Sequence, residues 1–256
     1  MSDYTVSISV VTYNSEEYIG KMLDSISNHV HSVKYKIFVI DNCSTDGTAD
    51  IVKRRNDNIV LIRNDHNLGF GKGHNQVLEM IDSKYHVCIN PDIYIETDVI
   101  GSMCEYLDQH SDIGILTPKV LYPNGDLQIL PKKDPKFIYL VSRRIGFSTL
   151  KKYREKYEML EMGVDNAYDI EFATGCFMFM RTDLLKKAGG FDERFFLYFE
   201  DADLARSIRK FARAEYNPQF TVYHYWERAG AKKAKYFIIQ IASMFKYLTK
   251  WRKSHR

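Results

Sequence analysis

Three acidic side chains follow a cluster of aromatic residues in the second half of the chain. The segment Phe191–Lys210 places five aromatic residues ahead of Glu200, Asp201 and Asp203. Apolar surroundings disfavour ionisation and can raise the pKa of a carboxyl group towards the working pH, as a general base requires. Acidic residues also cap helices, because they complement the positive end of the helix dipole. The apolar spacing that follows predicts a helix beginning at these acids, so base and cap are equally favoured by this segment alone.

Asp92 is a candidate metal ligand. It stands in Asn90-Pro91-Asp92, directly after the most apolar predicted strand of the first half. Mg²⁺ takes only one or two protein carboxylates and completes its coordination with phosphate and water, so Asp92 suits a cation that also binds a diphosphate. A simple turn explains the same residues equally well. His224 stands alone among aromatic residues, where a buried, hydrogen-bonded histidine is as good an interpretation as a ligand.

Two further segments could contact a nucleotide. Asp41 ends a predicted strand, and the Ser, Thr and Asp residues after it can cap a helix whose free N–H groups face the same crevice. The segment Asn67–Asn75 has three glycines at alternate positions, which let backbone approach a ligand, and Lys72 could meet a phosphate. Its spacing matches neither a P-loop nor a dinucleotide fingerprint. A turn without a ligand and a flexible loop therefore stay open as alternatives.

Alternating strand and helix patterns must position these residues. The predicted strands are Val6–Val11, Ile37–Ile40, Ile59–Ile62 and Tyr85–Ile89, with helices predicted around 18–26, 49–52 and 77–81. This order predicts βαβ units with right-handed crossovers, and hence an α/β fold with a mainly parallel central sheet flanked by helices. Ligands of such sheets bind beyond the carboxyl ends of the strands, so Thr12, Asp41 and Asp92 are expected at one edge.

The second half has a less regular pattern. The expected elements are a helix over 99–110, a hairpin of 113–122 with 126–130 around Asn124-Gly125, a loop-plus-helix insertion over 131–169, a strand over 170–180, a helix over 182–188 ended by Gly189, a strand over 220–225 and a helix over 232–251.

The length, the charge and the cysteine content limit the possible classes of function. The 256 residues fit one large or two small domains, and 45% hydrophobic residues are enough for a sizeable core. The net charge of +3 hides two basic stretches, 131–156 and 229–256, which predict an anionic partner such as a membrane surface, phosphates or nucleic acid. Four scattered cysteines favour reduced thiols. With no export leader or long apolar run, we expect a cytoplasmic protein.

Taken in order, six motifs resemble the family 2 inverting glycosyltransferases, especially the bacterial rhamnosyltransferase-like branch that builds surface polysaccharides. The motifs are Thr-Tyr-Asn-Ser-Glu with Val-Ile-Asp-Asn-Cys-Ser-Thr-Asp-Gly-Thr, Asn-Leu-Gly-Phe-Gly-Lys-Gly-His-Asn, Asn-Pro-Asp, Thr-Gly-Cys-Phe-Met-Phe-Met-Arg, Gly-Gly-Phe-Asp-Glu-Arg-Phe-Phe-Leu-Tyr-Phe-Glu-Asp-Ala-Asp-Leu and Val-Tyr-His. The resemblance runs from about Ser7 to Tyr225 and is less specific for the sugar. It implies a GT-A-like catalytic domain over 1–230, with a nucleotide-binding half to about 110 and an acceptor-binding half over 111–230.

The resemblance also implies roles for single residues. It places Thr12, Tyr13, Asn14, Asp41, Asn67, Gly69, Lys72 and Asn90 at a nucleotide-sugar donor, Gly175 and Glu200 at the acceptor, Asp92 and His224 at Mg²⁺ or Mn²⁺, and Asp201 with Glu200 at the reacting centre. The family's metal motif usually has two acids flanking one residue, and here Asn90 replaces the first. In the implied reaction, Asp201 takes the proton of an acceptor hydroxyl as it attacks the anomeric carbon. The resemblance implies dTDP-rhamnose as the first candidate donor and a UDP-hexose as the second. It implies a lipid-linked saccharide as the acceptor.

The C-terminal segment 231–256 is predicted to form a basic amphipathic helix. Its apolar stripe comprises Phe237, Ile241, Met244, Phe245 and Leu248. Such a helix can lie on an anionic bilayer, while packing on the domain or on a second subunit of a homodimer is an equal alternative.

Two other functional classes fit less well. A nucleotidyltransferase usually carries a Gly-rich basic loop where this chain has Tyr13-Asn14-Ser15. A nucleic-acid-binding protein leaves the acids at the strand ends unexplained, so no nucleic-acid partner is expected.

Overall fold

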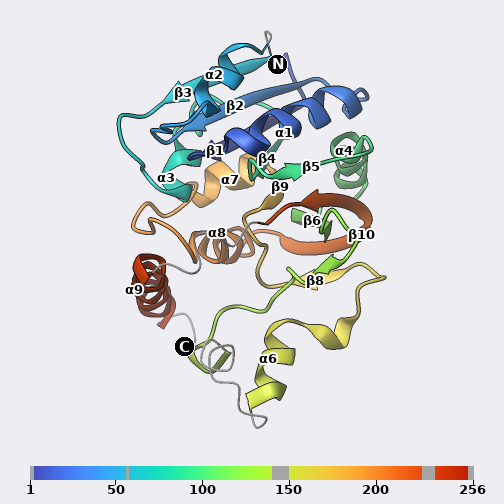
Figure 1. The fold of residues 1–256 in the computed structure, drawn as a ribbon. Coiled ribbons are helices and arrows are strands. Elements are labelled where there is room, and N and C mark those ends of the chain that lie inside the picture. The colour runs from blue at the N-terminus through green and yellow to red at the C-terminus, as the bar shows by residue number, and fades with distance from the viewer. Residues whose placement is uncertain (1–2, 56–57, 140–149, 227–233, 253–256) are drawn as a thin grey trace.

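A single sheet with helices on both faces forms the centre of the molecule (Figure 1). The computed structural model describes residues 3–55, 58–139, 150–226 and 234–252. The strands are β1 (Val6–Thr12), β2 (Tyr35–Asp41), β3 (Ile59–Arg63), β4 (Tyr85–Ile89), β5 (Ile93–Tyr94), β6 (Ile113–Leu121), β7 (Leu127–Gln128), β8 (Tyr168–Ile170), β9 (Phe177–Arg181) and β10 (Arg213–His224). The helices are α1 (Glu16–His29), α2 (Thr48–Lys53), α3 (Phe70–Asn75), α4 (Val99–Gln109), α6 (Lys151–Tyr157), the 3₁₀ helix η2 (Leu160–Met162), α7 (Thr182–Ala188), α8 (Glu200–Ile208) and α9 (Ala234–Trp251).

The direction of the strands decides where the functional residues meet. The order is β3-β2-β1-β4-β9-β6-β10-β5, with β7 on β6 and β8 on β10. Parallel pairing joins β3, β2, β1 and β4, and also joins β6 to β10. Strand β9 is antiparallel to both β4 and β6, so these two strands point the same way. The carboxyl ends of β1, β2, β4 and β10 therefore lie at one edge of the sheet, where β9 begins. The predicted α/β fold is confirmed.

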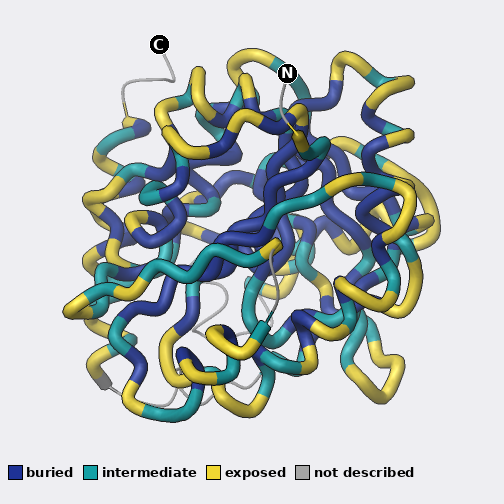
Figure 2. Tube along the Cα trace, turned by 90° about the horizontal axis from the view of Figure 1, so that it is seen from above, coloured by how far each residue is buried: buried dark blue, intermediate teal, exposed yellow. Residues whose placement is uncertain are grey.

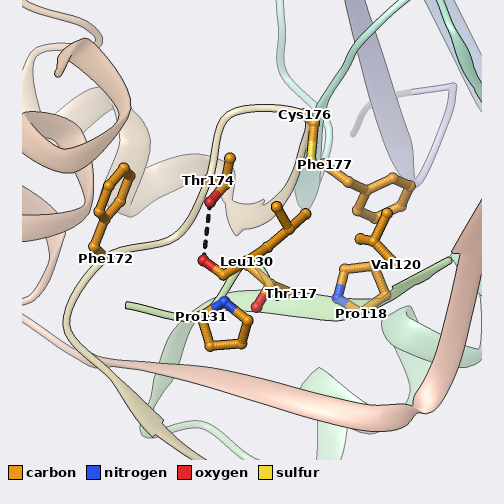
Figure 3. Close-up of a pocket in the computed structure, with 9 residues that line it drawn as sticks. All are labelled: Thr117, Pro118, Val120, Leu130, Pro131, Phe172, Thr174, Cys176 and Phe177. Carbon is orange, nitrogen blue, oxygen red and sulfur yellow. Dashed lines mark hydrogen bonds between the residues drawn. The ribbon is translucent and has the colours of Figure 1, made fainter. Parts of the chain in front are cut away.

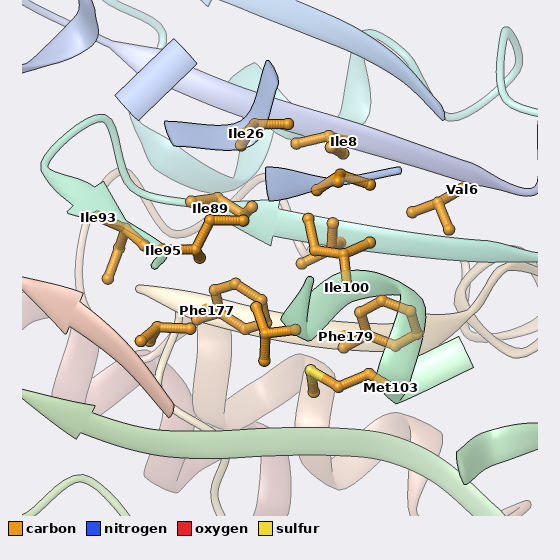
Figure 4. Close-up of a cluster of buried hydrophobic side chains, with 14 of the residues drawn as sticks. Val6, Ile8, Ile26, Ile89, Ile93, Ile95, Ile100, Met103, Phe177 and Phe179 are labelled. Atoms are coloured by element: carbon orange, nitrogen blue, oxygen red, sulfur yellow. The ribbon is translucent and has the colours of Figure 1, made fainter. Parts of the chain in front are cut away.

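Two apolar layers hold the sheet between its helices. Side chains of α1, α2 and α4 pack on one face, and side chains of α7 and α8 on the other. Strand β9 serves both layers, because Phe177 and Phe179 face the first and Met178 and Met180 face the second. Figure 4 shows the two phenylalanines beside residues of α4 and β4. In Figure 2 the buried strands run through the centre and the exposed residues gather in the outer loops.

The first four predicted strands are confirmed, but the helix predicted over 77–81 is wrong. The helix lies earlier, at α3, and its glycines allow very close packing. A Cβ at Gly73 would lie 2.8 Å from Val11 Cγ2, and one at Gly71 would lie 2.8 Å from Phe191 Cβ. Val77 and Ile81 enter the core from the turns that follow. Apolar spacing alone does not distinguish a short helix from a series of turns.

The strand predicted over 170–180 is also wrong, because the chain forms two separate strands there. It leaves β8 after Ile170 and enters β9 at Phe177. Between them Phe172 N donates to Lys132 O at 2.9 Å, outside the main sheet. The last strand begins at Arg213 rather than Phe220, since Glu215 is buried with Arg213 and Tyr106 as partners. Paired charges make a polar segment compatible with a buried strand.

The other predictions for the second half agree with the structure. The helices α4 and α7 are present, and α7 ends at Gly189, whose φ is +82°. The predicted hairpin joins β6 to β7 through Gly125, whose φ is +87°. The predicted insertion contains α6 and η2 within its described part, while 140–149 lies outside the described residues.

The C-terminal helix is present as α9, but its predicted apolar stripe is divided between two faces. Met244 is buried together with Tyr247 and Trp251, whereas Phe245 is 57% exposed. Lys232 and Lys233, two lysines of the predicted basic stretch 229–256, lie outside the described residues. Within the described ranges, no helix combines the length and the apolar character needed to cross a bilayer.

Candidate active site

Thr12 and Asp41 end the neighbouring strands β1 and β2 and pair with each other in the sheet. The Oγ1 atom of Thr12 is buried and, among the described residues, has no hydrogen-bond partner. The Asp41 side chain is fully buried, with Oδ1 accepting from Ser44 N at 3.1 Å and Oδ2 from Arg63 Nε at 3.2 Å. Since a carboxylate offers about four acceptor positions, Asp41 keeps capacity for a further donor. A polar ligand group bound at this strand end could therefore form hydrogen bonds with both Thr12 and Asp41.

Asn14 joins the loops that follow these strands. It adopts a left-handed conformation with φ of +52°, which asparagine tolerates better than most residues. Its Oδ1 accepts from Thr45 N at 2.8 Å, and its own N–H donates to Ser44 Oγ at 2.9 Å. Tyr13 is about half exposed beside it. The structure therefore gives Asn14 a loop-shaping role and leaves the Tyr13 ring at the surface of this edge.

The glycine-rich segment packs against protein. Asn67 Oδ1 accepts from Gly69 N at 2.9 Å. Gly69 has φ of +86°, and a Cβ there would lie 2.1 Å from the carbonyl oxygen of Phe196. The close approaches of this segment thus bring it to the aromatic loop before α8. Lys72 Nζ lies 3.7 Å from Glu193 Oε2, and its contact with phosphate stays a prediction.

Asp92 and His224 come together at the end of β10. Strand β5 begins directly after Asp92 and pairs with β10, so Ile93 lies opposite His224, and Tyr225 N donates to Asp92 O at 3.1 Å. This pairing places His224 Nε2 3.3 Å from Asp92 Oδ1. The two predicted metal ligands, 132 positions apart by their numbers (224 − 92), are therefore neighbours.

Gln128 in β7 fixes the orientation of His224. Its Nε2 donates to His224 O at 2.7 Å, and its Oε1 accepts from His224 Nδ1 at 2.9 Å. With the proton on Nδ1, Nε2 directs a lone pair at the Asp92 carboxylate. Nε2 is buried and has no hydrogen bond among the described residues. His224 Nε2 and the Asp92 carboxylate are thus two acceptors that face each other, an arrangement that fits a cation bound between them. Gln128 stands where a second residue would orient a metal-binding histidine.

These donor atoms fit Mn²⁺ or Mg²⁺ only in part. Within the described chain, no group of three or more His, Cys, Asp or Glu residues could hold a metal. Phosphate and water supply most ligands of such ions in nucleotide sites, so two protein ligands suffice. An imidazole nitrogen suits Mn²⁺ better than Mg²⁺, which prefers oxygen. Asn90, two residues before Asp92, uses its backbone here: its N–H donates to Cys176 O at 2.9 Å.

Asp201 lies in the first turn of α8. Its Oδ2 accepts from Gly175 N at 3.0 Å, and its Oδ1 accepts from Ala202 N at 2.9 Å. A Cβ at Gly175 would lie 3.1 Å from the Phe70 ring and 3.3 Å from Asp201 Cβ, so glycine permits this close approach. Burial raises the pKa of the Asp201 carboxyl above its ordinary value, and the two amide N–H groups oppose that rise.

Glu200 differs from its neighbour. It is only 4% exposed, and its Oε2 has no hydrogen bond among the described residues. Burial, with a smaller effect from the Asp201 charge, raises the pKa of Glu200 well above its usual range. Asp201, held by two N–H donors, is thus the acid that ionises more readily. A protonated Glu200 can donate a hydrogen bond as well as accept one.

The segment Gly175–Cys176 connects the two groups of acids. Gly175 N bonds to Asp201, and Cys176 O accepts from Asn90 N, two residues before Asp92. Burial raises the pKa of the Cys176 thiol to about 12, and the Asp92 and Asp201 carboxylates contribute to the rise. Both carboxylates therefore lie within electrostatic reach of one thiol.

A small pocket adjoins this segment (Figure 3). It is lined by Leu130, Pro131, Phe172 and Cys176, and Thr174 Oγ1 donates to Leu130 O at 3.1 Å across it.

Two functional candidates were missed by the sequence reasoning. Gln128 belongs to no motif, and only the register of the hairpin brings it to His224. Burial raises the pKa of Asp201, and the Lys132 ammonium is among the groups that oppose this rise. The basic stretch 131–156 was the available signal for Lys132, but it did not indicate which lysine lies near the acids.

Comparison with known proteins decides the family. The sequence profile described as "Glycosyl transferase family 2" matches residues 7–189. This chain belongs to glycosyl transferase family 2. The resemblance expected from the motifs is thereby confirmed. The match ends before Glu200, so α8, β10 and α9 lie outside it and their proposed roles rest on the geometry.

Relatives of this family member are named for different sugars. It is 30% identical over 155 residues to the poly(ribitol-phosphate) beta-N-acetylglucosaminyltransferase TarS of Staphylococcus aureus, covering 58% of this chain and 27% of that protein. It is 24% identical over 218 residues to the N-acetylglucosaminyl-diphospho-decaprenol L-rhamnosyltransferase of Mycobacterium tuberculosis, covering 79% and 70%. The solved mannosyltransferase PcManGT of Pyrobaculum calidifontis, in complex with GDP-Man and Mn²⁺, matches with a TM-score of 0.65 at 19% identity, covering 98% of this chain and 64% of that one. The chain thus spans only about a quarter of the staphylococcal relative's length.

Proposed function

We propose that this protein transfers a sugar from a nucleoside-diphosphate sugar to a hydroxyl group of a glycan, with inversion at the anomeric carbon. One observation carries the proposal. Asp201 is partly buried and accepts a hydrogen bond from Gly175 N, while the next residue, Cys176, is hydrogen-bonded to the loop that bears Asp92. A base and a cation site on either side of one short segment are what a displacement between an acceptor hydroxyl and a diphosphate leaving group requires.

In the proposed reaction, Asp201 accepts the proton of the acceptor hydroxyl as the oxygen attacks the anomeric carbon from the face opposite the diphosphate. Glu200 would orient the acceptor by hydrogen bonding. Asp92 and His224 would hold Mn²⁺ or Mg²⁺, which neutralises charge on the departing diphosphate when bound. Thr12, Asn14 and Asp41 lie at the strand ends where the nucleoside is proposed to bind.

We propose dTDP-rhamnose as the donor and a lipid-linked saccharide as the acceptor, in the synthesis of a bacterial surface polysaccharide. The rhamnosyltransferase relative, which matches over 79% of this chain, supports rhamnose as the sugar and a lipid-linked acceptor. A UDP-hexose is the second candidate, supported by the N-acetylglucosaminyltransferase relative. With either donor, we propose that the enzyme works on the cytoplasmic side of the membrane.

We further propose that α9 touches the membrane with its outer face. Ile238 and Phe245 lie seven residues apart on this helix and are 67% and 57% exposed. Lys235, three residues before Ile238, is exposed, and so is Lys246 beside Phe245, although its ammonium turns back to Arg194 O. Apolar side chains flanked by lysines favour an anionic bilayer surface, which would bring the site near a lipid-linked acceptor.

Donor hydrolysis tests the proposal most directly. The protein is incubated with dTDP-rhamnose, UDP-glucose, UDP-N-acetylglucosamine and GDP-mannose, each with Mn²⁺ or Mg²⁺, and release of nucleoside diphosphate is measured. Selective, metal-dependent release from one donor is expected. Release of pyrophosphate from a nucleoside triphosphate would instead favour a nucleotidyltransferase.

A further inference from the structure

The end of α9 is fastened to Asp203, the third acid of the segment that contains Asp201. Trp251 Nε1 donates to Asp203 Oδ1 at 2.8 Å, and Lys250 Nζ donates to Asp203 Oδ2 at 2.7 Å. The same ammonium donates to Asp192 Oδ2 at 2.8 Å. Asp203 is only 2% exposed. Buried carboxylates need partners of this kind, because an unpaired buried charge is strongly unfavourable.

Other residues of α9 hold the loop that leads into α8. Ser243 Oγ donates to Leu197 O at 2.9 Å, and Lys246 Nζ donates to Arg194 O at 2.5 Å. An apolar cluster of Phe172, Phe195, Phe199, Ala202, Met244, Tyr247 and Trp251 fills the space between α9 and α8. Figure 1 shows α9 standing beside α8 at the end where this loop enters. The inner face of α9 therefore contacts both the loop and the first turn of α8.

This loop depends on such support for its conformation. Tyr198 and Phe199 both have φ of +69°, in the left-handed region that bulky residues rarely adopt. Such a conformation persists only where the surroundings impose it. It ends directly at Glu200 and Asp201, and Asp203 N donates to Phe199 O at 2.9 Å. A loosened loop would shift the first turn of α8, and with it the carboxylate that meets Gly175 N.

We propose that Lys250 and Trp251 are positioning residues, which hold Asp201 in its working geometry by fixing Asp203 and the loop before α8. The inference rests on the proposed role of Asp201 as the base. It makes α9 part of the catalytic structure, whereas a merely stabilising helix would affect unfolding without affecting the geometry at Gly175 and Ala202. Misplacement of a catalytic group by about 1 Å can lower the rate by about a hundredfold.

The test uses the full chain with three variants. Trp251→Phe keeps an aromatic ring but removes the N–H donor to Asp203. Lys250→Met removes the ammonium, and Lys250→Arg keeps a cation that can still bridge Asp203 and Asp192. Thr249→Ala, an exposed neighbour on α9, is the matched control. The kcat, the KM for the donor and the exchange rates of the Gly175 and Ala202 amide hydrogens are measured well below the unfolding temperature of each variant.

We expect Trp251→Phe and Lys250→Met to lower kcat by about 10- to 100-fold while the donor KM changes less than about threefold. The Gly175 and Ala202 amide hydrogens should exchange faster in both variants, and Lys250→Arg should recover much of the loss. Unchanged kcat and unchanged exchange in a folded Trp251→Phe protein would overturn the inference. The exchange experiment needs no substrate, so it decides the positioning role even if the proposed transferase activity fails.

Discussion

Two neighbouring acids illustrate how strongly the surroundings of a residue decide its chemistry. Glu200 and Asp201 share the first turn of α8, yet only Asp201 accepts from the amide groups of Gly175 and Ala202. Glu200 leaves Oε2 buried without a hydrogen bond among the described residues. The pair thus separates into an acid that tends to stay protonated and one that ionises more readily, which is a common arrangement for acid and base roles.

Replacing Asp201 by Asn should remove the proton acceptor while keeping much of the shape of the site. We expect kcat to fall by about 10² to 10⁴-fold, with donor affinity nearly unchanged, because general base catalysis is lost and the donor site is intact. Steady-state kinetics and calorimetric titration of the donor give the two quantities. Retained turnover would refute Asp201 as the base.

The pH dependence of turnover should also report Asp201. Burial raises its pKa, so the ionised base is lost at a higher pH than for an ordinary aspartate of pKa about 3.9. We therefore expect kcat/KM to fall on the acid side, above the pH where a free aspartate titrates. Glu200, which tends to stay protonated, and the Lys132 ammonium are neighbouring groups that act on this titration. A rate constant that stays level down to about pH 4 would contradict this origin.

Gln128 allows a test of the proposed cation site without measuring turnover. Gln128→Leu removes both hydrogen bonds to His224, so the ring can rotate and Nε2 can turn away from Asp92. We expect the affinity for Mn²⁺, titrated calorimetrically with a nucleoside diphosphate present, to fall by about 10- to 100-fold. Ile129→Ala, at an exposed neighbouring position, is the control. Equal titrations of Gln128→Leu and the control would exclude the orienting role.

Among the secondary-structure elements, β1, β4 and α3 share a buried polar chain inside the apolar layers. Ser83 Oγ donates to Ser7 Oγ, Ser7 and Ser9 contact the two nitrogens of His86 at 2.6 and 2.8 Å, and Ser9 Oγ lies 2.7 Å from His74 Nδ1. Burial lowers the pKa of His86 to about 3 and that of His74 well below its usual range. Both histidines are therefore neutral in the folded protein.

This polar chain makes the sheet sensitive to acid. Unfolded histidine titrates near pH 6.5 and buried His86 near 3, so the unfolded state binds more protons between these values and stability falls as the pH drops below about 6.5. Each such histidine removes about 1.4 kcal/mol per pH unit in that range. Denaturant unfolding at pH 7.5 and pH 5.5 should show this loss, and His86→Asn should show a smaller one. An identical pH dependence in both proteins would contradict the assignment.

On the scale of the whole molecule, α9 has two faces with different partners. Its inner face holds the loop before α8, so deleting 231–256 would damage the site as well as any membrane contact. Surface substitutions separate the two effects. Ile238→Ser combined with Phe245→Ser should reduce flotation with anionic vesicles severalfold, because exposed apolar area is removed.

The same double variant should transfer sugar to a short, water-soluble acceptor at the normal rate. Equal flotation of the double variant and the unmodified protein would exclude the membrane contact. A change from dimer to monomer in sedimentation would instead show that this face meets a second subunit.

Much of the fold follows from local patterns. The β-branched segments from Val6 to Ile89 predict four strands because each is short, apolar and bounded by turn residues. Their parallel order follows from the intervening helices, and this order alone places Thr12, Asp41 and Asp92 at one edge of the sheet. The helix at Glu200 and the stop at Gly189 follow equally from local residue types.

Tertiary structure alone decided how the second half completes the site. The reversal of β9 leaves Gly175–Cys176 between Asp201 and Asn90, and the hairpin register brings Gln128 to His224. Packing also decided which face of α9 is buried. Lys250 and Trp251 donate hydrogen bonds to Asp203, which lies 47 and 48 positions earlier in the chain. Local spacing reports which side chains share a face, whereas the partner of that face depends on contacts between distant segments. The sequence therefore determined the family, the first four strands and the acids, and the folded chain determined which residues hold those acids in place.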